Sequence, residues 1–157
     1  MMKLASRVTI DRLGAQGDGI VTLEGRDLFI PHGLPGERVD ILQDGATGEI
    51  TNLLDASPER RTPPCAFFGQ CGGCVLQQAS PALYRDWKSK ILRDTLQQAG
   101  VSCVPEPLQD AHGDGRRRVT LHARRESGGW QVGFMARRSH RLVAISACLL
   151  LVPALST

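Results

Sequence analysis

The sequence predicts a mainly β protein with one helix, an α+β fold in which a small OB-type barrel is followed by an antiparallel sheet. Short runs of alternating apolar and polar residues, separated by glycine-containing turns, fill residues 6–55 and recur in residues 116–148. One stretch of helical periodicity, residues 81–99, lies between them. Four cysteines flank this stretch, three of them close together. A site that binds all four thiols is therefore expected to link distant segments of the second half of the chain.

The first predicted domain, residues 1–56, is expected to be the barrel. Turn signals separate five short predicted strands, 6–13, 20–23, 28–30, 37–42 and 48–54. The glycine-rich run 14–19 lies between two strands and lacks a following Lys-Ser/Thr pair. It is therefore predicted to be a tight turn and not a phosphate-binding loop, and His32 is interpreted as a loop residue.

The second predicted domain, residues 57–157, opens with a proline-rich linker and contains the helix. Ser80 is expected to cap the helix, Pro81 to fill its first position and Gly100 to end it. An apolar stripe is predicted along one face, formed by Leu83, Trp87, Ile91 or Leu92, Leu96 and Ala99. The basic residues of the helix lie largely off this stripe, so a solvated face is favoured over RNA contact.

A polar loop, residues 101–115, is expected after the helix, with Cys103 as a spare thiol. Three antiparallel strands follow in the prediction, 118–124, 130–136 and 140–145. The alternation places Trp130, Val132, Phe134 and Ala136 on one face of the middle strand. The third strand leads into Cys148, which a rigid element would then hold.

The cysteine spacing is the most specific feature of the chain. Cys65, Cys71 and Cys74 form a C-x5-C-x2-C run, and Gly72-Gly73 allows the backbone to wrap around a common centre. With Cys148, four thiolates complete a tetrahedral or cubane site. Structural zinc sites usually draw on two close pairs, so the spacing favours an iron–sulfur cluster. Zinc, and a disulfide or inert thiols, are the alternatives.

Charge is distributed unevenly along the chain. Residues 1–56 hold five basic and nine acidic residues, whereas residues 111–157 hold eight basic and two acidic ones. All eight are arginines, whose planar side chains suit phosphate. They predict RNA contact by the second sheet, the alternative being a solvated sheet edge. The candidates for RNA contact are Arg116, Arg117, Arg118, Arg124, Arg137 and Arg138.

Targeting signals are not evident in the sequence. No apolar run approaches the roughly 18 residues of a membrane span, and the N-terminus lacks the apolar segment of a signal peptide. The five cysteines are an odd number, which argues against a disulfide framework. A cytoplasmic protein without a membrane partner is therefore expected, and we expect a monomer.

Two sets of residues resemble known families. The Gly17-Asp18-Gly19 turn and the segment 29–37, Phe-Ile-Pro through Leu-Pro-Gly-Glu, resemble a TRAM domain, an RNA-binding OB-like module. The cysteine run with Gln77, the arginine triplet 116–118, Val132-Gly133-Phe134 and the late Cys148 resemble the iron–sulfur branch of the RNA uracil-5 methyltransferases acting on large-subunit ribosomal RNA. This resemblance implies a [4Fe–4S] cluster on Cys65, Cys71, Cys74 and Cys148.

The resemblance also implies an RNA (uracil-5-)-methyltransferase that uses S-adenosylmethionine and acts on structured rRNA. Members of that family continue into a Rossmann-like domain with the cofactor site, a cysteine nucleophile and a carboxylate base. The 157 residues show no glycine-rich loop after a strand and no βαβ alternation, so they are expected to bind RNA and a cluster without catalysing. No catalytic residue is assigned. A ferredoxin-like redox protein and a zinc-stabilised RNA-binding module are the alternatives.

Overall fold

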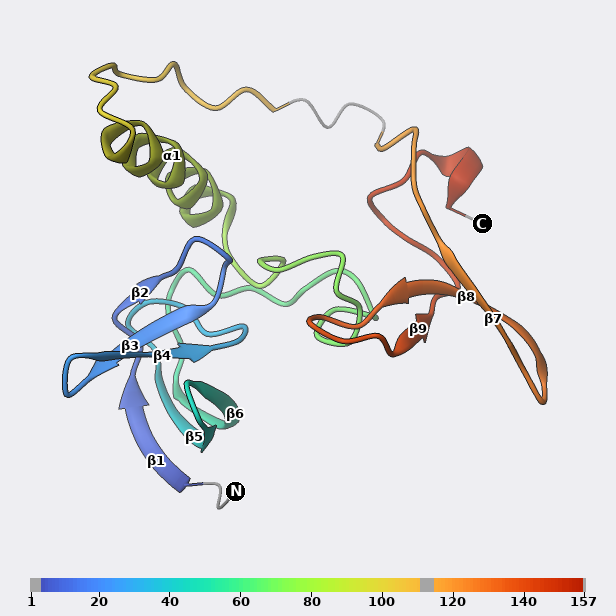
Figure 1. Cartoon of the computed structure of the whole chain (residues 1–157), viewed down its shortest axis with the longest axis horizontal. Coiled ribbons are helices and arrows are strands. Elements are labelled where there is room, and N and C mark those ends of the chain that lie inside the picture. Colours follow the sequence, from blue (N-terminus) through green and yellow to red (C-terminus); the bar gives the residue numbers. More distant parts are fainter. Residues whose placement is uncertain (1–3, 111–114, 157) are drawn as a thin grey trace. The chain divides into compact units, whose positions relative to one another are not determined.

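The computed structural model describes residues 4–110 and 115–156 (Figure 1). The chain forms two compact units, one comprising Met1–Thr62 and Gln78–Leu108, the other Pro63–Gln77 and Gln109–Thr157. The fold is mostly β with one long helix, as predicted. Of the predicted polar loop 101–115, residues 111–114 lie outside the described residues.

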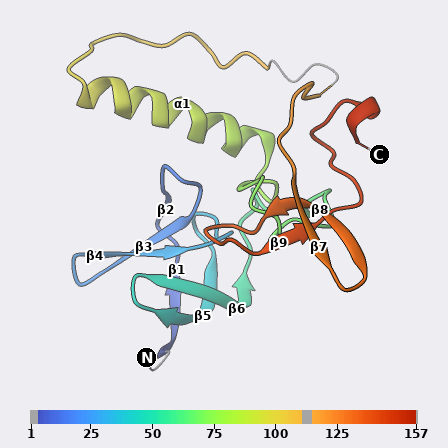
Figure 2. The same ribbon diagram turned by 45° about the vertical axis from the view of Figure 1, so that its right-hand side comes forward.

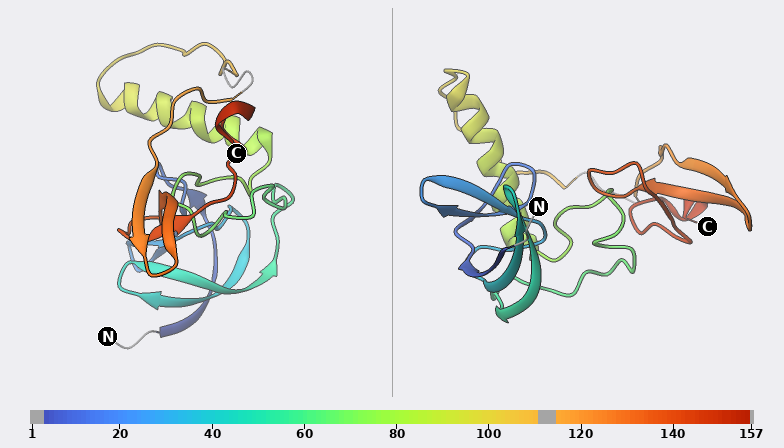
Figure 3. Two further views of the ribbon diagram at one scale, coloured as in Figure 1. Left: turned by 90° about the vertical axis from the view of Figure 1, so that its right-hand side faces the viewer. Right: turned by 60° about the horizontal axis from the view of Figure 1, so that its bottom comes forward.

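The first unit is built on a curled six-stranded sheet that forms a half-barrel (Figure 3). Its strands are β1 Leu4–Thr9, β2 Arg12–Leu13, β3 Gly19–Leu23, β4 Arg26–Ile30, β5 Arg38–Asp44 and β6 Thr47–Asp55, in the order β1-β5-β6-β4-β3-β2. Neighbours are antiparallel except β4 and β6, which meet in parallel at Phe29 and Thr47. Alternate residues point inward and form the core, consisting of Val8, Ile10, Val21, Leu28, Ile30, Val39 and Ile41.

The single strand predicted over residues 6–13 is in fact two strands. Its first part, β1, pairs with β5, and its second part, β2, pairs with β3. At the junction the amide of Ile10 donates to the carbonyl of Glu37 and the amide of Asp11 to that of Ile20, both at 2.9 Å. The chain therefore changes partners without losing backbone hydrogen bonds, a change that alternation alone does not reveal.

The β3–β4 hairpin has the turn its sequence favours. Glu24 and Gly25 both have positive φ, 50° and 75°. Two-residue hairpin loops with positive φ at both positions match the twist of the flanking strands. The predicted turn at 14–19 is also present, closed by hydrogen bonds between the backbones of Gly14 and Asp18, 2.8 Å, and of Gly17 and Gly14, 3.0 Å.

The helix, α1 Pro81–Gln98, belongs to the first unit and confirms the predicted caps. The Ser80 hydroxyl accepts a hydrogen bond from the amide of Leu83, 3.1 Å, and Gly100 has φ +73°. Of the predicted apolar stripe, only Trp87 is buried. Its indole donates to the carbonyl of Gly14 at 2.8 Å, which ties the helix to the turn before β3.

The second unit contains a three-stranded antiparallel sheet, β7 His122–Glu126, β8 Gly129–Met135 and β9 Leu142–Ala144, and a final 3-10 turn, Pro153–Leu155. Compared with the prediction, β7 begins four residues later and ends two residues later, β8 is shifted by one residue, and only β9 is shorter at both ends. Because β9 pairs only with Gly133–Met135, the β7–β8 hairpin continues beyond it (Figure 2). At this end the face that carries Trp130 and Val132 is open, and these side chains are 70% and 43% exposed.

Within the described residues, no helix combines the length and the apolar character needed to cross a membrane.

Candidate functional site

All four predicted cysteine ligands lie around one cavity in the second unit. Cys65, Cys71, Cys74 and Cys148 line a space of about 50 Å³. Since one water-sized atom needs about 10–15 Å³, this space holds several atoms and not one alone. The rest of the wall is largely apolar, contributed mainly by Phe67, Phe68, Val119, Phe134, Ile145 and Leu149–Leu151.

The cysteine loop is attached to the end of β8 through its backbone. Cys71 forms an isolated bridge with Ala136, and the amide of Gly72 donates to the carbonyl of Met135 at 2.9 Å. A Cβ atom at position 72 would lie 2.8 Å from that carbonyl oxygen. Glycine is therefore required at position 72 by the close approach of two backbones.

Backbone hydrogen bonds shape the loop between its cysteines. The amide of Phe68 donates to the carbonyl of Cys65 at 3.1 Å, and the amide of Cys71 to that of Phe67 at 2.9 Å. The amide of Gly73 lies 3.4 Å from the Cys71 sulfur and donates to it. Amide donors to sulfur stabilise thiolate ligands and tune the centre they hold.

Cys148 was predicted directly at the end of the third strand, but it lies four residues beyond the end of β9, at the start of a turn. The amide of Leu151 and the hydroxyl of Ser156 donate to the Cys148 carbonyl, at 3.2 and 3.1 Å. Arg116 holds the same segment with two backbone hydrogen bonds, to Leu150, 2.7 Å, and from Val152, 3.1 Å. The rigidity expected from a strand is thus supplied by a paired turn.

The four thiols are close enough to affect one another. The pKa of Cys74 is raised, first because burial disfavours the thiolate, and also because Cys71, Cys148 and Cys65 would add like charge nearby. The side chain of Gln77 hydrogen-bonds to Cys74 and opposes this rise. A bound cationic centre would stabilise the thiolates, and so would offset both the cost of burying them and the repulsion between them.

The four thiols could hold a metal centre that is either a single ion or a cluster. Across residues 4–110 and 115–156, no three His, Cys, Asp or Glu side chains converge as one metal ion requires. Zinc holds four sulfurs at about 2.3 Å from one point, whereas a cubane binds each thiolate through a different iron and spreads the ligands apart. The four thiols of this chain lie around one cavity of about 50 Å³. Cys103 is exposed and does not line the cavity.

The candidate RNA-contacting arginines lie on three segments of the second unit. Arg116, Arg117 and Arg118 precede β7 and are exposed, Arg124 lies within β7, and Arg137 and Arg138 lie in the turn after β8. The side chain of Arg124 donates to the carbonyl of His140 at 3.4 Å. Residues 115–156 contain a single acid, Glu126, which accepts a hydrogen bond from Gln131 at 2.9 Å.

The arginines of the half-barrel are, in contrast, mostly paired with carboxylates. Ion pairs join Arg7 to Asp40 at 2.8 Å, Arg12 to Asp27 at 2.7 Å and Arg38 to Asp55 at 2.8 Å. Hydrogen bonding to these arginines lowers the pKa of Asp40 and of Asp27. In the described part of the second unit, Arg116, Arg117, Arg118, Arg125 and Arg141 form no ion pair. Uncompensated positive charge is therefore concentrated there.

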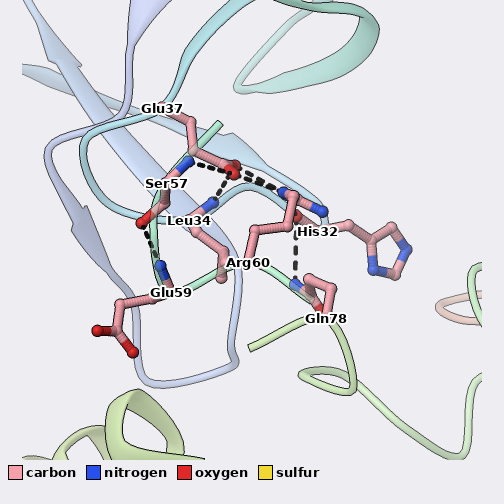
Figure 4. A network of polar contacts seen from close by, with 7 residues as sticks. All are labelled: His32, Leu34, Glu37, Ser57, Glu59, Arg60 and Gln78. Carbon is pink, nitrogen blue, oxygen red and sulfur yellow. Dashed lines mark hydrogen bonds and ion pairs between the residues drawn. The ribbon is translucent and has the colours of Figure 1, made fainter. Parts of the chain in front are cut away.

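One polar centre was not predicted from the sequence. The carboxylate of Glu37 is fully buried in the first unit, where it pairs with Arg60 and accepts from the amides of Leu34, 2.8 Å, and Ser57, 3.3 Å (Figure 4). Arg60 also donates to the carbonyl of His32 at 2.7 Å. The only sequence signal was a glutamate inside the Leu-Pro-Gly-Glu segment, which does not distinguish a buried carboxylate from an exposed one.

The chain is similar in sequence to proteins named RNA methyltransferases. No family model matches it. It is 44% identical over 144 residues to an uncharacterized RNA methyltransferase of Caulobacter vibrioides and 41% identical over 152 residues to one of Rhizobium meliloti, with 90% and 93% of this chain aligned. It is also 36% identical over 159 residues to the 23S rRNA (uracil(1939)-C(5))-methyltransferase RlmD of Halomonas elongata, with 96% aligned. The chain spans about a third of the length of these relatives, 35%, 37% and 33%.

Proposed function

Because the chain belongs to the family of RNA methyltransferases represented by these relatives and corresponds to their N-terminal part, we propose that it is the RNA-recognising and cluster-binding part of an rRNA uracil-5 methyltransferase. The complete enzyme would use S-adenosylmethionine to methylate a uridine of large-subunit rRNA. In this proposal residues 1–56 form a TRAM-like domain and residues 57–157 the iron–sulfur region. The protein would act as a cytoplasmic monomer.

The observation that carries the proposal is the gathering of Cys65, Cys71, Cys74 and Cys148 around one cavity, with a relative that acts on rRNA. These four residues would hold a [4Fe–4S] cluster. Its role here would be structural, because methyl transfer from S-adenosylmethionine moves no net electrons. The thiolates would join the turn containing Cys148 to the loop 65–74, two segments far apart in the sequence.

A redox role and a single zinc ion are the competing proposals. A single zinc ion would require all four sulfurs to lie at about 2.3 Å from one point. Iron and acid-labile sulfide analysis of anaerobically purified chain separates these cases. We expect about four of each per chain, and stoichiometric zinc in a folded, colourless sample would refute the cluster.

The arginines of residues 116–118 provide a test of RNA recognition. Replacing all three by Ala should weaken binding to an rRNA fragment and flatten the dependence of log affinity on log salt by about 0.7 to 0.9 per lost phosphate contact. Alanine keeps the backbone hydrogen bonds by which Arg116 holds residues 150–152. Fluorescence anisotropy over a salt series measures both quantities.

The matched control replaces Arg7, Arg12 and Arg26 of the half-barrel by Ala. Two of these three are engaged by carboxylates, so a smaller loss of RNA affinity is expected. The reverse ranking would show that the half-barrel and not the second unit carries the charge that binds RNA. Unchanged binding in both variants would remove arginine contact from the proposal.

S-adenosylmethionine should not bind to this chain alone. Dinucleotide and nucleoside cofactors of this kind are held at the strand ends of a parallel βαβ sheet. Throughout residues 4–110 and 115–156 the sheets are antiparallel apart from the β4–β6 contact, and α1 connects no parallel pair. Isothermal titration is expected to show no binding, and micromolar affinity would contradict this.

A further inference from the structure

Trp130 is the most exposed aromatic side chain of the described residues, at 70%. It is the second residue of β8, close to the turn of the β7–β8 hairpin. Val132 on the same strand is 43% exposed and Leu121, just before β7, is 40% exposed. Single exposed apolar residues are ordinary, but a large indole that keeps most of its surface in water leaves much apolar area available for a ligand.

The strand register decides which residues share the face of Trp130. Trp130 pairs directly with Arg125 and Val132 with Ala123, so these four lie on one face of the hairpin. Arg124 and Gln131 pair on the opposite face. The face carrying Trp130 therefore combines an indole, a guanidinium and small apolar side chains.

Charge on this face is positive and uncompensated. Arg125 makes no ion pair with the described acidic residues. Glu126, the one acid of residues 115–156, is adjacent to Arg125 on the strand and hydrogen-bonds to Gln131 on the other face. An apolar protein partner would gain nothing from an unpaired arginine at the centre of its contact, whereas a nucleotide uses both the ring and the charge.

We propose that Trp130 stacks on an unpaired RNA base while Arg125 contacts the adjoining phosphate. This rests on the proposed RNA function and adds the class of ligand, a single-stranded or looped-out segment and not a continuous duplex. Base stacking on an aromatic ring is tolerant of sequence and needs a base that is free of its neighbours, so duplex RNA cannot use the same surface.

The test compares a labelled single-stranded oligoribonucleotide with the fully paired duplex of the same sequence, using the full chain. Trp130→Ala should weaken binding of the single strand by about tenfold or more and leave duplex binding and the salt slope unchanged. Trp130→Phe should retain most of the affinity. Val132→Ala, an exposed change on the same face, is the matched control and should change little.

Tryptophan emission gives a second readout that does not depend on the alanine variant. Stacking should quench the emission of the wild-type chain on RNA addition, and Trp130→Phe, which retains the buried Trp87, should lose that quenching. Circular dichroism checks that the variants remain folded.

The outcomes separate the two proposals. Loss of affinity in the Arg116–Arg118 variant with unchanged binding by Trp130→Ala would overturn stacking and leave the RNA function standing. Equal losses on single strand and duplex would also overturn stacking. Absence of binding by the wild-type chain to both probes would overturn the RNA function itself. A wild-type dimer that Trp130→Ala converts to a monomer, with RNA affinity unchanged, would assign this face to a second copy.

Discussion

Cys148→Ser should abolish or strongly deplete the cluster and produce the largest effect of any single change. The cavity would keep three thiols, all from one loop, and would lose the only ligand that joins residues 148–152 to it. Serine is a hard oxygen donor and a poor replacement for thiolate on iron. Iron and sulfide content should fall from about four per chain toward zero after anaerobic purification, with loss of the brown colour.

Cys103→Ser is the matched control, because it makes the same chemical change at an exposed cysteine outside the cavity. Its iron content and visible spectrum should equal those of the wild-type chain. Equal depletion in both variants would show that the fourth ligand is misassigned. A loss confined to Cys103→Ser would replace Cys148 by Cys103 in the ligand set.

Glu37→Ala should destabilise the first unit by about 3 kcal/mol, since removing one partner of a buried ion pair leaves the other uncompensated. The carboxylate is fully buried, accepts from two backbone amides and pairs with Arg60. The value is expected near the lower end of the usual range because the Arg60 side chain is 23% exposed and can be partly solvated. Urea denaturation followed by circular dichroism measures the difference.

Asp55→Ala provides the comparison, since it removes a carboxylate from an ion pair on the surface of the same sheet. The side chains of Arg38 and Asp55 are 53% and 61% exposed. Exposed pairs contribute at most about 1 kcal/mol, so a small change in the urea midpoint is expected. Comparable losses in the two variants would mean that the Glu37 network adds nothing beyond an ordinary surface contact.

The sequence shows an uneven distribution of charge, but ion pairing decides which of the arginines remain available to a ligand. The sequence shows nine acidic residues in 1–56, but it does not show that three arginines of the half-barrel are already bound to three of them. It likewise shows eight arginines after residue 111 without showing that Glu126 turns to the face opposite Trp130. Which positive charges face a ligand depends on strand register, which joins residues distant in sequence.

The helix ends and the tight turns could be predicted from the sequence, because they depend on interactions within a few residues. Ser80, Pro81 and Gly100 bounded the helix because capping hydrogen bonds and restricted φ values act within a few residues. The turn at Glu24-Gly25 follows from the ease with which glycine adopts positive φ. The grouping of Cys65, Cys71 and Cys74 around one cavity followed from spacing, because three thiols within ten residues are brought together by the loop itself.

Only the tertiary structure shows how these elements pack and which of their side chains are exposed. Helical periodicity marked Trp87 as apolar, but only its hydrogen bond to Gly14 shows that the helix joins the unit of the half-barrel. Alternation grouped Trp130 with Phe134 on one face of the strand, but it did not show that β9 is too short to pair beside Trp130 and leaves it exposed. The burial of Glu37 and the support of Cys148 by the backbone of Arg116 depend on segments more than 20 residues apart. The sequence by itself determined the kinds of elements and the grouping of three thiols in one loop, since both arise from neighbouring residues. Their pairing, exposure and polar contacts were decided by long-range packing, which no local pattern encodes.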